Sequence, residues 1–117
     1  MSKYYNDTLP NGLRTVMIPI KTSPSVVIGV YIKVGSRYEE SKNNGVAHFL
    51  EHMMFKGTNK YTSDKLVKTL DTLGAFYNAG TSHEYTYYYI SGIPEHLKKF
   101  MFLLSDIYYN STIPKKE

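Results

Sequence analysis

The run His48-Phe49-Leu50-Glu51-His52 limits the folding of this chain most, because its polar residues share one side only in an α-helix. A helix advances about 100° per residue, so positions 48, 51, 52 and 55 lie on one stripe. The opposite side then carries four apolar residues, Val46, Phe49, Leu50 and Met53. We therefore predict a helix over residues 46–55 that packs one face on a core and presents two imidazoles and a carboxylate on the other.

The residue types in this run point to a metal site. Two neutral imidazoles one turn apart can converge on one ion, and with a carboxylate ligand they would make a zinc site that leaves a position open for water. Glu51 lies beside them and suits a general base that takes a proton from that water and passes it to a leaving amine. The chain has no cysteine, so a metal site must use His, Asp or Glu. The alternative is that both histidines are ordinary solvated residues of a helix surface.

The segments before this helix predict strands. A turn signal at residues 9–12 precedes a short strand over residues 14–18. Residues 26–34 carry an apolar residue at every second position, which is typical of a strand with one face on a core. We expect these two strands to form an antiparallel pair. An Asn at position 43 or 44 can cap the helix that follows, and Gly57 can stop it.

The segments after this helix complete an α+β pattern. A second helix is predicted from the N-cap Ser63 to the stop at Gly74, with Leu66, Val67, Leu70 and Leu73 at helical spacing. Residues 75–79 and 84–90 predict two strands joined by a turn around Gly80. Pro94 suits the first turn of a third helix with one apolar face, made of Leu97, Met101, Leu104 and Tyr108. The order predicts an α+β domain whose helices pack on an antiparallel or mixed sheet.

Length and charge disfavour several classes of protein. The 117 residues suffice for one domain with one core, and no internal boundary is visible. No apolar stretch approaches the ~20 residues of a membrane span. The lysines are scattered and outnumber two arginines, which disfavours nucleic-acid binding. Residues 1–7 lack the pattern of a secretory signal or a presequence, so either the protein stays where it is made, which favours the cytoplasm, or a presequence was removed.

The residues around the helix also resemble a known family. Residues 35–58 resemble the pitrilysin family of inverzincin metallopeptidases, in particular mitochondrial processing peptidase β-subunits and their bacterial relatives. The matching residues are Gly35-Ser36-Arg37, the run from Asn43-Asn44-Gly45 to His52, and Gly57-Thr58. Residues 9–13 resemble the opening strand of that family, and residues 74–79 and 81–89 resemble a later strand pair. The resemblance implies a zinc-dependent endopeptidase for unfolded peptides, with roughly the first half of a metallohydrolase domain of the processing-peptidase type.

Carried over residue by residue, the resemblance makes His48 and His52 ligands of Zn²⁺ and Glu51 the base. It implies that Glu84 either contacts the metal ligands from outside the zinc site or lies beside the substrate. It assigns an edge strand, to which an unfolded peptide adds as an extra strand, to Asn78, Ala79 and Thr81. Glu84 could instead be a solvated strand residue, and Asn78 a turn residue before Gly80. His83 and His96 have no partner at ligand spacing and are expected at the surface.

The chain departs from the family pattern after its last residue. A catalytic zinc site needs three protein ligands, and the family's third is a Glu roughly 75 residues after the second His, beyond Glu117. We therefore expect residues 1–117 to be the N-terminal part of a single peptidase domain, inactive alone, whose partner is the remaining half or a homologous subunit. Exposed apolar surface should cause self-association. The alternative function is a non-catalytic scaffold or interaction subunit, which the family includes but which typically loses part of the motif.

Overall fold

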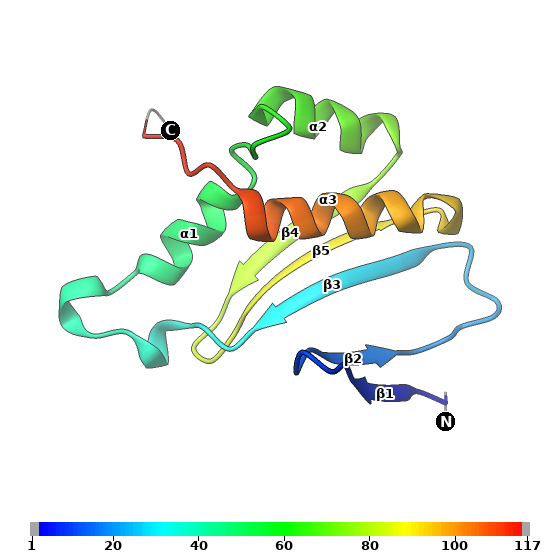
Figure 1. Ribbon diagram of the computed structural model, residues 1–117, viewed down its shortest axis with the longest axis horizontal. Helices are drawn as coiled ribbons and strands as arrows, with labels where there is room; N and C mark the ends of the chain where they lie inside the picture. The colour runs from blue at the N-terminus through cyan, green and yellow to red at the C-terminus, as the bar shows by residue number, and fades with distance from the viewer. Residues whose placement is uncertain (1–2, 116–117) are drawn as a thin grey trace.

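The structure is a computed structural model that describes residues 3–115. A three-stranded antiparallel sheet forms the centre of the molecule (Figure 1). Its strands run in the order β3 (Val26–Ile32), β5 (Thr86–Gly92) and β4 (Phe76–Thr81). Three helices accompany it: α1 (Val46–Met54), α2 (Ser63–Thr72) and α3 (Leu97–Asn110). Short 3-10 turns precede α1 at Ser36–Tyr38 and Ser41–Asn43, and a third, Pro94–His96, leads into α3. The predicted α+β class is confirmed.

The core lies between one face of the sheet and the helices. Residues 86, 88 and 90 of β5 are buried, while the alternate residues 87 and 89 are only half-buried, so one face of the sheet is covered. The buried residues of the core cluster come from β5 and all three helices: Met54, Leu66, Leu70, Tyr88, Ile90, Phe100, Leu103, Leu104 and Ile107. This core holds α1 against the end of the sheet and thereby positions the site.

The first two strands form a separate hairpin. β1 (Tyr5–Thr8) pairs with β2 (Arg14–Met17) through a turn in which the N–H of Gly12 donates to the carbonyl of Leu9. The predicted pairing of residues 14–18 with 26–34 is wrong, because within residues 3–115 β2 pairs with β1 and β3 pairs with β5. Strand β1 was not predicted. A five-residue connection closes at little entropic cost, which favours the local partner.

The α1 helix buries a different side from the one predicted. Ala47, Met53 and Met54 are buried, whereas Val46 and Phe49 are exposed, Phe49 by 58%. The helix packs against β4 at the edge of the sheet, so the core reaches it mainly at its C-terminal end. The predicted burial is therefore confirmed for Met53 and wrong for Val46 and Phe49, while Leu50 is half-buried.

Gly80 is a strand residue rather than the predicted turn. It lies within β4 opposite Tyr87, and the turn follows at residues 82–85, where the N–H of Ser82 donates to the carbonyl of Tyr85. A Cβ at position 80 would lie 2.5 Å from the hydroxyl of Tyr87. The glycine thus makes room for an aromatic ring of the neighbouring strand, a use of glycine that resembles a turn signal in sequence.

The other two helices differ from prediction in detail. α2 is capped by Thr62, whose hydroxyl accepts the N–H of Lys65, and not by Ser63. Its predicted apolar face is confirmed at Leu66, Leu70 and Leu73. In α3 the buried side is made of Phe100, Leu103, Leu104 and Ile107, and Met101 and Tyr108 are exposed. Phe100 determines this rotation because its ring lies over Gly92, where any Cβ would clash.

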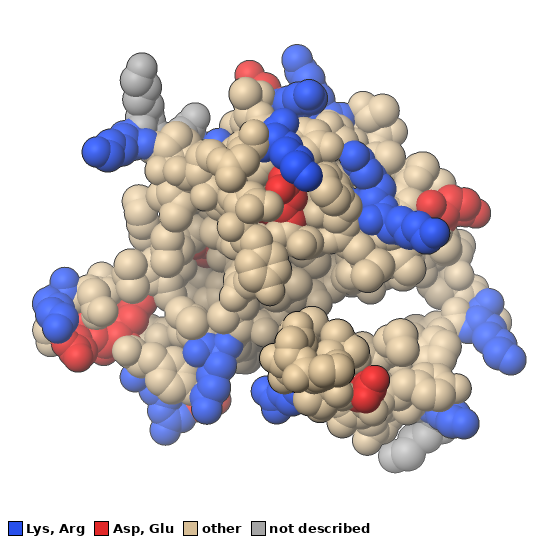
Figure 2. Space-filling view, in the orientation of Figure 1, with Lys and Arg blue, Asp and Glu red and all other residues tan. Residues whose placement is uncertain are grey.

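Charged side chains are spread over the molecule. On the face shown in Figure 2, Lys and Arg side chains lie at many separate points of the outline and do not gather in one patch. Within residues 3–115, no helix has both the length and the apolar character needed to cross a bilayer. Two of the predictions from sequence fall outside the described part of the chain. One concerns residues 1–2 of the segment considered for targeting, and the other concerns the third ligand expected beyond Glu117.

Candidate active site

Two imidazoles on α1 converge. The Nε2 atoms of His48 and His52 are 2.9 Å apart, and the ring centroids are 4.7 Å apart. Both side chains leave the same side of the helix because they are one turn apart, as the sequence predicts. A tetrahedral Zn²⁺ bonded at ~2.1 Å would hold two nitrogens about 3.4 Å apart, so a small separation of the rings would admit the ion. The histidine pair therefore fits two positions of a zinc site.

The N-terminus of α1 is held by an acid that lies outside the helix. The carboxylate of Glu39 accepts the N–H of Gly45 at 2.7 Å and that of Ala47 at 2.9 Å. These two hydrogen bonds, chiefly the one from Ala47, hold the pKa of Glu39 below its usual value. The N-cap is Gly45, with a φ of 89°, which has no side chain that could cap the helix. The predicted Asn cap is therefore wrong, since a carboxylate from the preceding loop satisfies the free amides.

Glu51 lies where α1 meets the sheet. It is half-buried, and the hydroxyl of Thr81, the last residue of β4, donates a hydrogen bond to its Oε2. The buried phenol of Tyr88 lies on the same face of the sheet. Burial raises the pKa of Tyr88 to about 12, and the nearby charges of Glu51 and Tyr108 contribute to the rise. The base predicted from sequence thus has a hydroxyl donor on one oxygen and an un-ionised phenol nearby.

A hollow of about 490 Å³ opens between the start of α1 and the end of β4. His48 and Glu51 line it together with Glu39, Thr81 and His83. The Nδ1 of His83 is 2.8 Å from the hydroxyl of Ser36, a contact across 47 residues of sequence. His83 is exposed, as predicted, but it stands at the rim of this hollow. Sequence reasoning missed Ser36, Glu39 and His83, because no spacing rule relates them to the helix.

The turn after β4 is tied to the loop before α1. The side chains of Arg37 and Glu84 form an ion pair, and the N–H of Arg37 donates to the carbonyl of His83 at 2.8 Å. Glu84 therefore lies in the turn and contacts neither histidine of α1. His96, also expected at the surface, is half-buried in the turn before α3, with its ring against Phe100.

β4 is an edge strand of the described sheet, where Asn78, Ala79 and Thr81 lie. The N–H of Ser82 donates to the carbonyl of Tyr85, so residues 82 and 85 form a hydrogen-bonded pair. In an antiparallel pair such positions alternate, and residues 76, 78 and 80 of β4 are therefore the ones hydrogen-bonded to β5. The main-chain groups of residues 77, 79 and 81 then point to the open side. The N–H of Ala79 donates to the side chain of Asn78 at 2.8 Å. A single side chain thus covers one donor of this edge.

The donor atoms of the described residues can be compared with the needs of a metal site. Within residues 3–115, no group of three or more His, Cys, Asp or Glu side chains is placed to hold an ion. His48 and His52 are the pair that approaches such a group, and Glu51 is bonded to Thr81. The donor set fits zinc in type, with two imidazole nitrogens, but it provides two ligands where three are needed.

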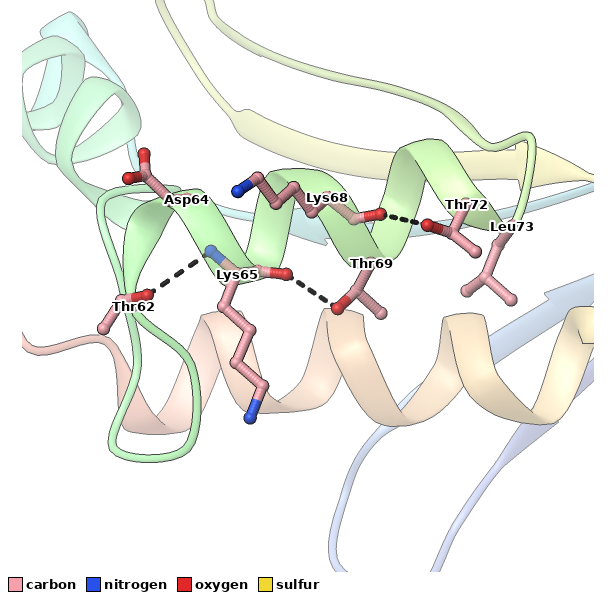
Figure 3. A pocket seen from close by; sticks show the side chains of 7 residues that line it. All are labelled: Thr62, Asp64, Lys65, Lys68, Thr69, Thr72 and Leu73. Atoms are coloured by element: carbon pink, nitrogen blue, oxygen red, sulfur yellow. Dashed lines mark hydrogen bonds between the residues drawn. The ribbon is translucent and has the colours of Figure 1, made fainter.

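A second hollow, of about 520 Å³, runs along α2 (Figure 3). Its hydroxyl groups are used within the helix: Thr69 donates to the carbonyl of Lys65 and Thr72 to that of Lys68, each at 2.7 Å. The hydroxyl of Thr62 caps the helix. No side chains converge on a common point in Figure 3, and the lysine ammonium groups point away from one another. The hollow beside α1 is therefore the candidate active site.

Several known proteins resemble this chain over most of its length. The model of the insulinase family, peptidase family M16, matches residues 14–117. The chain is 42% identical to an uncharacterized zinc protease of Bacillus subtilis and 47% identical to the mitochondrial-processing peptidase subunit beta of Caenorhabditis elegans, each over 110 residues and 94% of this chain. The crystal structure of a protease from Helicobacter pylori superposes on the whole chain with a TM-score of 0.92 and 32% identity. The chain spans 27%, 24% and 28% of these three proteins, about a quarter of their length.

Proposed function

Because the chain belongs to the insulinase family of peptidases, family M16, we propose that it contributes the base and two metal ligands of a zinc endopeptidase that cleaves unfolded peptides. The observation that carries this proposal is the convergence of His48 and His52 beside the hollow that Glu51 lines. The intact motif supports catalysis, since its three polar residues are of the types that the chemistry requires and two of them, His48 and Glu51, line the hollow.

The residues of this chain would have separate roles in the reaction. A Zn²⁺ held by His48 and His52 would supply a Lewis acid and an acidified water. An oxygen of Glu51 would take the proton from the attacking water and deliver it to the nitrogen of the leaving amine. Tyr88, un-ionised at ordinary pH, would keep a further negative charge out of the surroundings of Glu51. The half-buried position of Glu51 strengthens its interactions by limiting water.

The third ligand is proposed to come from outside the described residues. Two imidazoles leave a zinc site incomplete, and residues 3–115 form no group of three His, Cys, Asp or Glu side chains that could hold the ion. We therefore expect the 117-residue chain to be inactive by itself as the N-terminal part of a peptidase domain. A further part of the protein or a homologous subunit would complete the site. The relative from Caenorhabditis elegans is named as a subunit, which supports such a partner.

The open edge of β4 is the proposed place for substrate. An extended peptide could bond to the main-chain groups of Ala79 and Thr81, which point away from β5, and would displace the side chain of Asn78. Unfolded peptides suit this mode because a folded segment has no free main-chain groups to offer. For Glu84 we propose an indirect part, since its ion pair with Arg37 ties the turn after β4 to the loop before α1.

The decisive experiment replaces the base in the complete natural protein that contains this chain. Glu51→Gln should reduce cleavage of an unfolded peptide by about a thousandfold or more, because the proton acceptor is lost, while zinc content stays at the wild-type level. Glu95→Gln, which changes an exposed carboxylate on the approach to α3, is the matched control. A chelator should abolish the activity and added zinc should restore it.

The alternative, a non-catalytic scaffold or interaction subunit, predicts a different outcome. Two observations support it: the described residues bring together only two possible metal ligands, and one relative is named as a subunit. In that case the wild-type complete protein would cleave no peptide, and Glu51→Gln would leave its binding to partner subunits unchanged. Chelator-sensitive cleavage by the 117-residue chain alone would contradict the proposal that a third ligand lies elsewhere.

A further inference from the structure

The carboxylate of Glu51 is held by one hydroxyl. Within residues 3–115, the recorded side-chain donor to this carboxylate is Thr81, whose Oγ1 donates to Oε2. A Glu side chain has three torsions, and the last one is broad and nearly two-fold, so a free carboxylate samples many orientations. One hydrogen bond to a fixed strand removes much of that freedom. The second oxygen stays free for proton transfer.

Thr81 is well anchored for this purpose. It is the last residue of β4, paired with Thr86 of β5, and it is half-buried between the sheet and α1. Thr86 is itself fixed, since its buried hydroxyl donates to the carbonyl of Val34 at 2.8 Å. β-branched residues such as Thr also have restricted χ1 angles. The hydroxyl of Thr81 is therefore a rigid donor, fixed by three strands of the same sheet.

The same residue also belongs to the open edge. By the register of β4 and β5, the main-chain groups of Thr81 point away from β5, on the side where a peptide would add. Its side chain meanwhile reaches Glu51. One residue thus connects the strand proposed to bind substrate with the group proposed to move the proton.

We propose that Thr81 is a positioning residue for Glu51: its hydroxyl fixes the orientation of the base relative to a peptide bound along β4. This inference rests on the proposed peptidase function. It assigns to Thr81 a part separate from binding the peptide main chain, because the side chain and the main-chain groups of this residue have different partners. The hydroxyl should therefore act on kcat and leave KM nearly unchanged.

The test uses Thr81→Val, Thr81→Ser and Glu51→Gln in the complete protein that contains this chain. Val keeps the shape and the strand preference of Thr but has no donor, so kcat should fall about tenfold, with KM within about twofold and with full zinc content. Ser keeps the hydroxyl and should recover most of kcat. Thr72→Val is the matched control, because it removes a hydroxyl that bonds only within α2.

A second measurement needs no activity. In zinc-free protein, Thr81→Val and Glu51→Ala should each lower the thermal midpoint, and the double variant should lower it by less than the sum, as coupled groups do. Additive shifts, a wild-type kcat in Thr81→Val, or a Ser variant as slow as the Val variant would each overturn the assignment. If Glu51→Gln leaves peptide cleavage intact, the proposed function fails instead, and the thermal cycle still decides whether Thr81 holds Glu51.

Discussion

Glu39 acts on the site-bearing helix from the loop that precedes it. Its carboxylate accepts two amides at the start of α1, which would otherwise lack partners. A negative charge at this end also interacts favourably with the helix dipole. Because His48 follows Ala47 directly, the loop and the proposed ligand are connected through this cap.

We predict a pH-dependent effect of Glu39→Gln on the complete protein. The pKa of Glu39 is lowered in the folded state from an ordinary value of 4.5, so its stabilisation is present above that value. It is lost as the pH falls through the folded pKa. Glu39→Gln should therefore lower the thermal midpoint at neutral pH, and the difference from wild type should disappear in strong acid. Glu95→Gln is the control, and a pH-independent difference would refute the proposed cap.

A buried carboxylate joins the loop after α1 to α3. Asp106 accepts the hydroxyl of Thr58 at 2.6 Å and the side-chain amide of Asn110 at 2.8 Å. Asp106 and Thr58 are 4% and 7% exposed. Thr58 also accepts the N–H groups of Lys60 and Tyr61, so it organises the loop as well.

Thr58→Val should destabilise the protein by about 2–3 kcal/mol, because it removes one donor from a buried carboxylate and an acceptor from two amides. Urea denaturation measures the loss. Asp106→Asn in the Thr58→Val background should recover part of it, since an amide is less costly to bury than an under-bonded charge. A loss below about 0.5 kcal/mol would mean that the network contributes little.

The β4 strand is the element whose open edge can be tested directly. Ala79→Pro removes an N–H that points away from β5, and proline is tolerated at such edge positions. If a peptide bonds to this edge, KM should rise about tenfold while kcat changes little. Steady-state kinetics of the complete protein measures both. A control peptide that is N-methylated at successive positions should show the reciprocal loss at one register, and an unchanged KM for Ala79→Pro would exclude this edge.

The molecule as a whole exposes more surface than a compact domain of its mass. Its accessible surface is 8851 Å², against about 6,500 Å² expected for 13.5 kDa. The radius of gyration is 15.5 Å, where about 13.4 Å is typical of 117 residues. Apolar side chains are exposed on the β1–β2 hairpin and directly after it: Leu13, Val16, Met17, Ile18 and Ile20.

We predict that the 117-residue chain, expressed on its own, self-associates through this surface. Exposed apolar patches of this kind seek a partner, and the hairpin lies at the outer edge of the molecule (Figure 1). Sedimentation velocity should show a concentration-dependent increase in mass. The double variant Val16→Lys, Ile18→Lys should shift the protein towards monomer. A monodisperse monomer at millimolar concentration would contradict the prediction.

The sequence alone determined the local elements and the paired histidines. Helical spacing brings His48 and His52 to one side of α1 whatever surrounds it, and alternation identifies β3. Such features depend on the backbone repeat, which is the same in every helix and strand. Gly80 shows the limit of this reasoning, because a glycine that accommodates a ring from another strand looks like a turn residue.

Only the tertiary structure decided which elements are neighbours. It paired β3 with β5 and not with β2, left Phe49 exposed, and brought Thr81 to Glu51 and Glu39 to the start of α1. The last two contacts join residues 30 and 8 positions apart and follow no periodic rule, since they result from how the sheet and helices share one core. The polar side of α1 was therefore predictable, whereas the residues that surround and orient it were not.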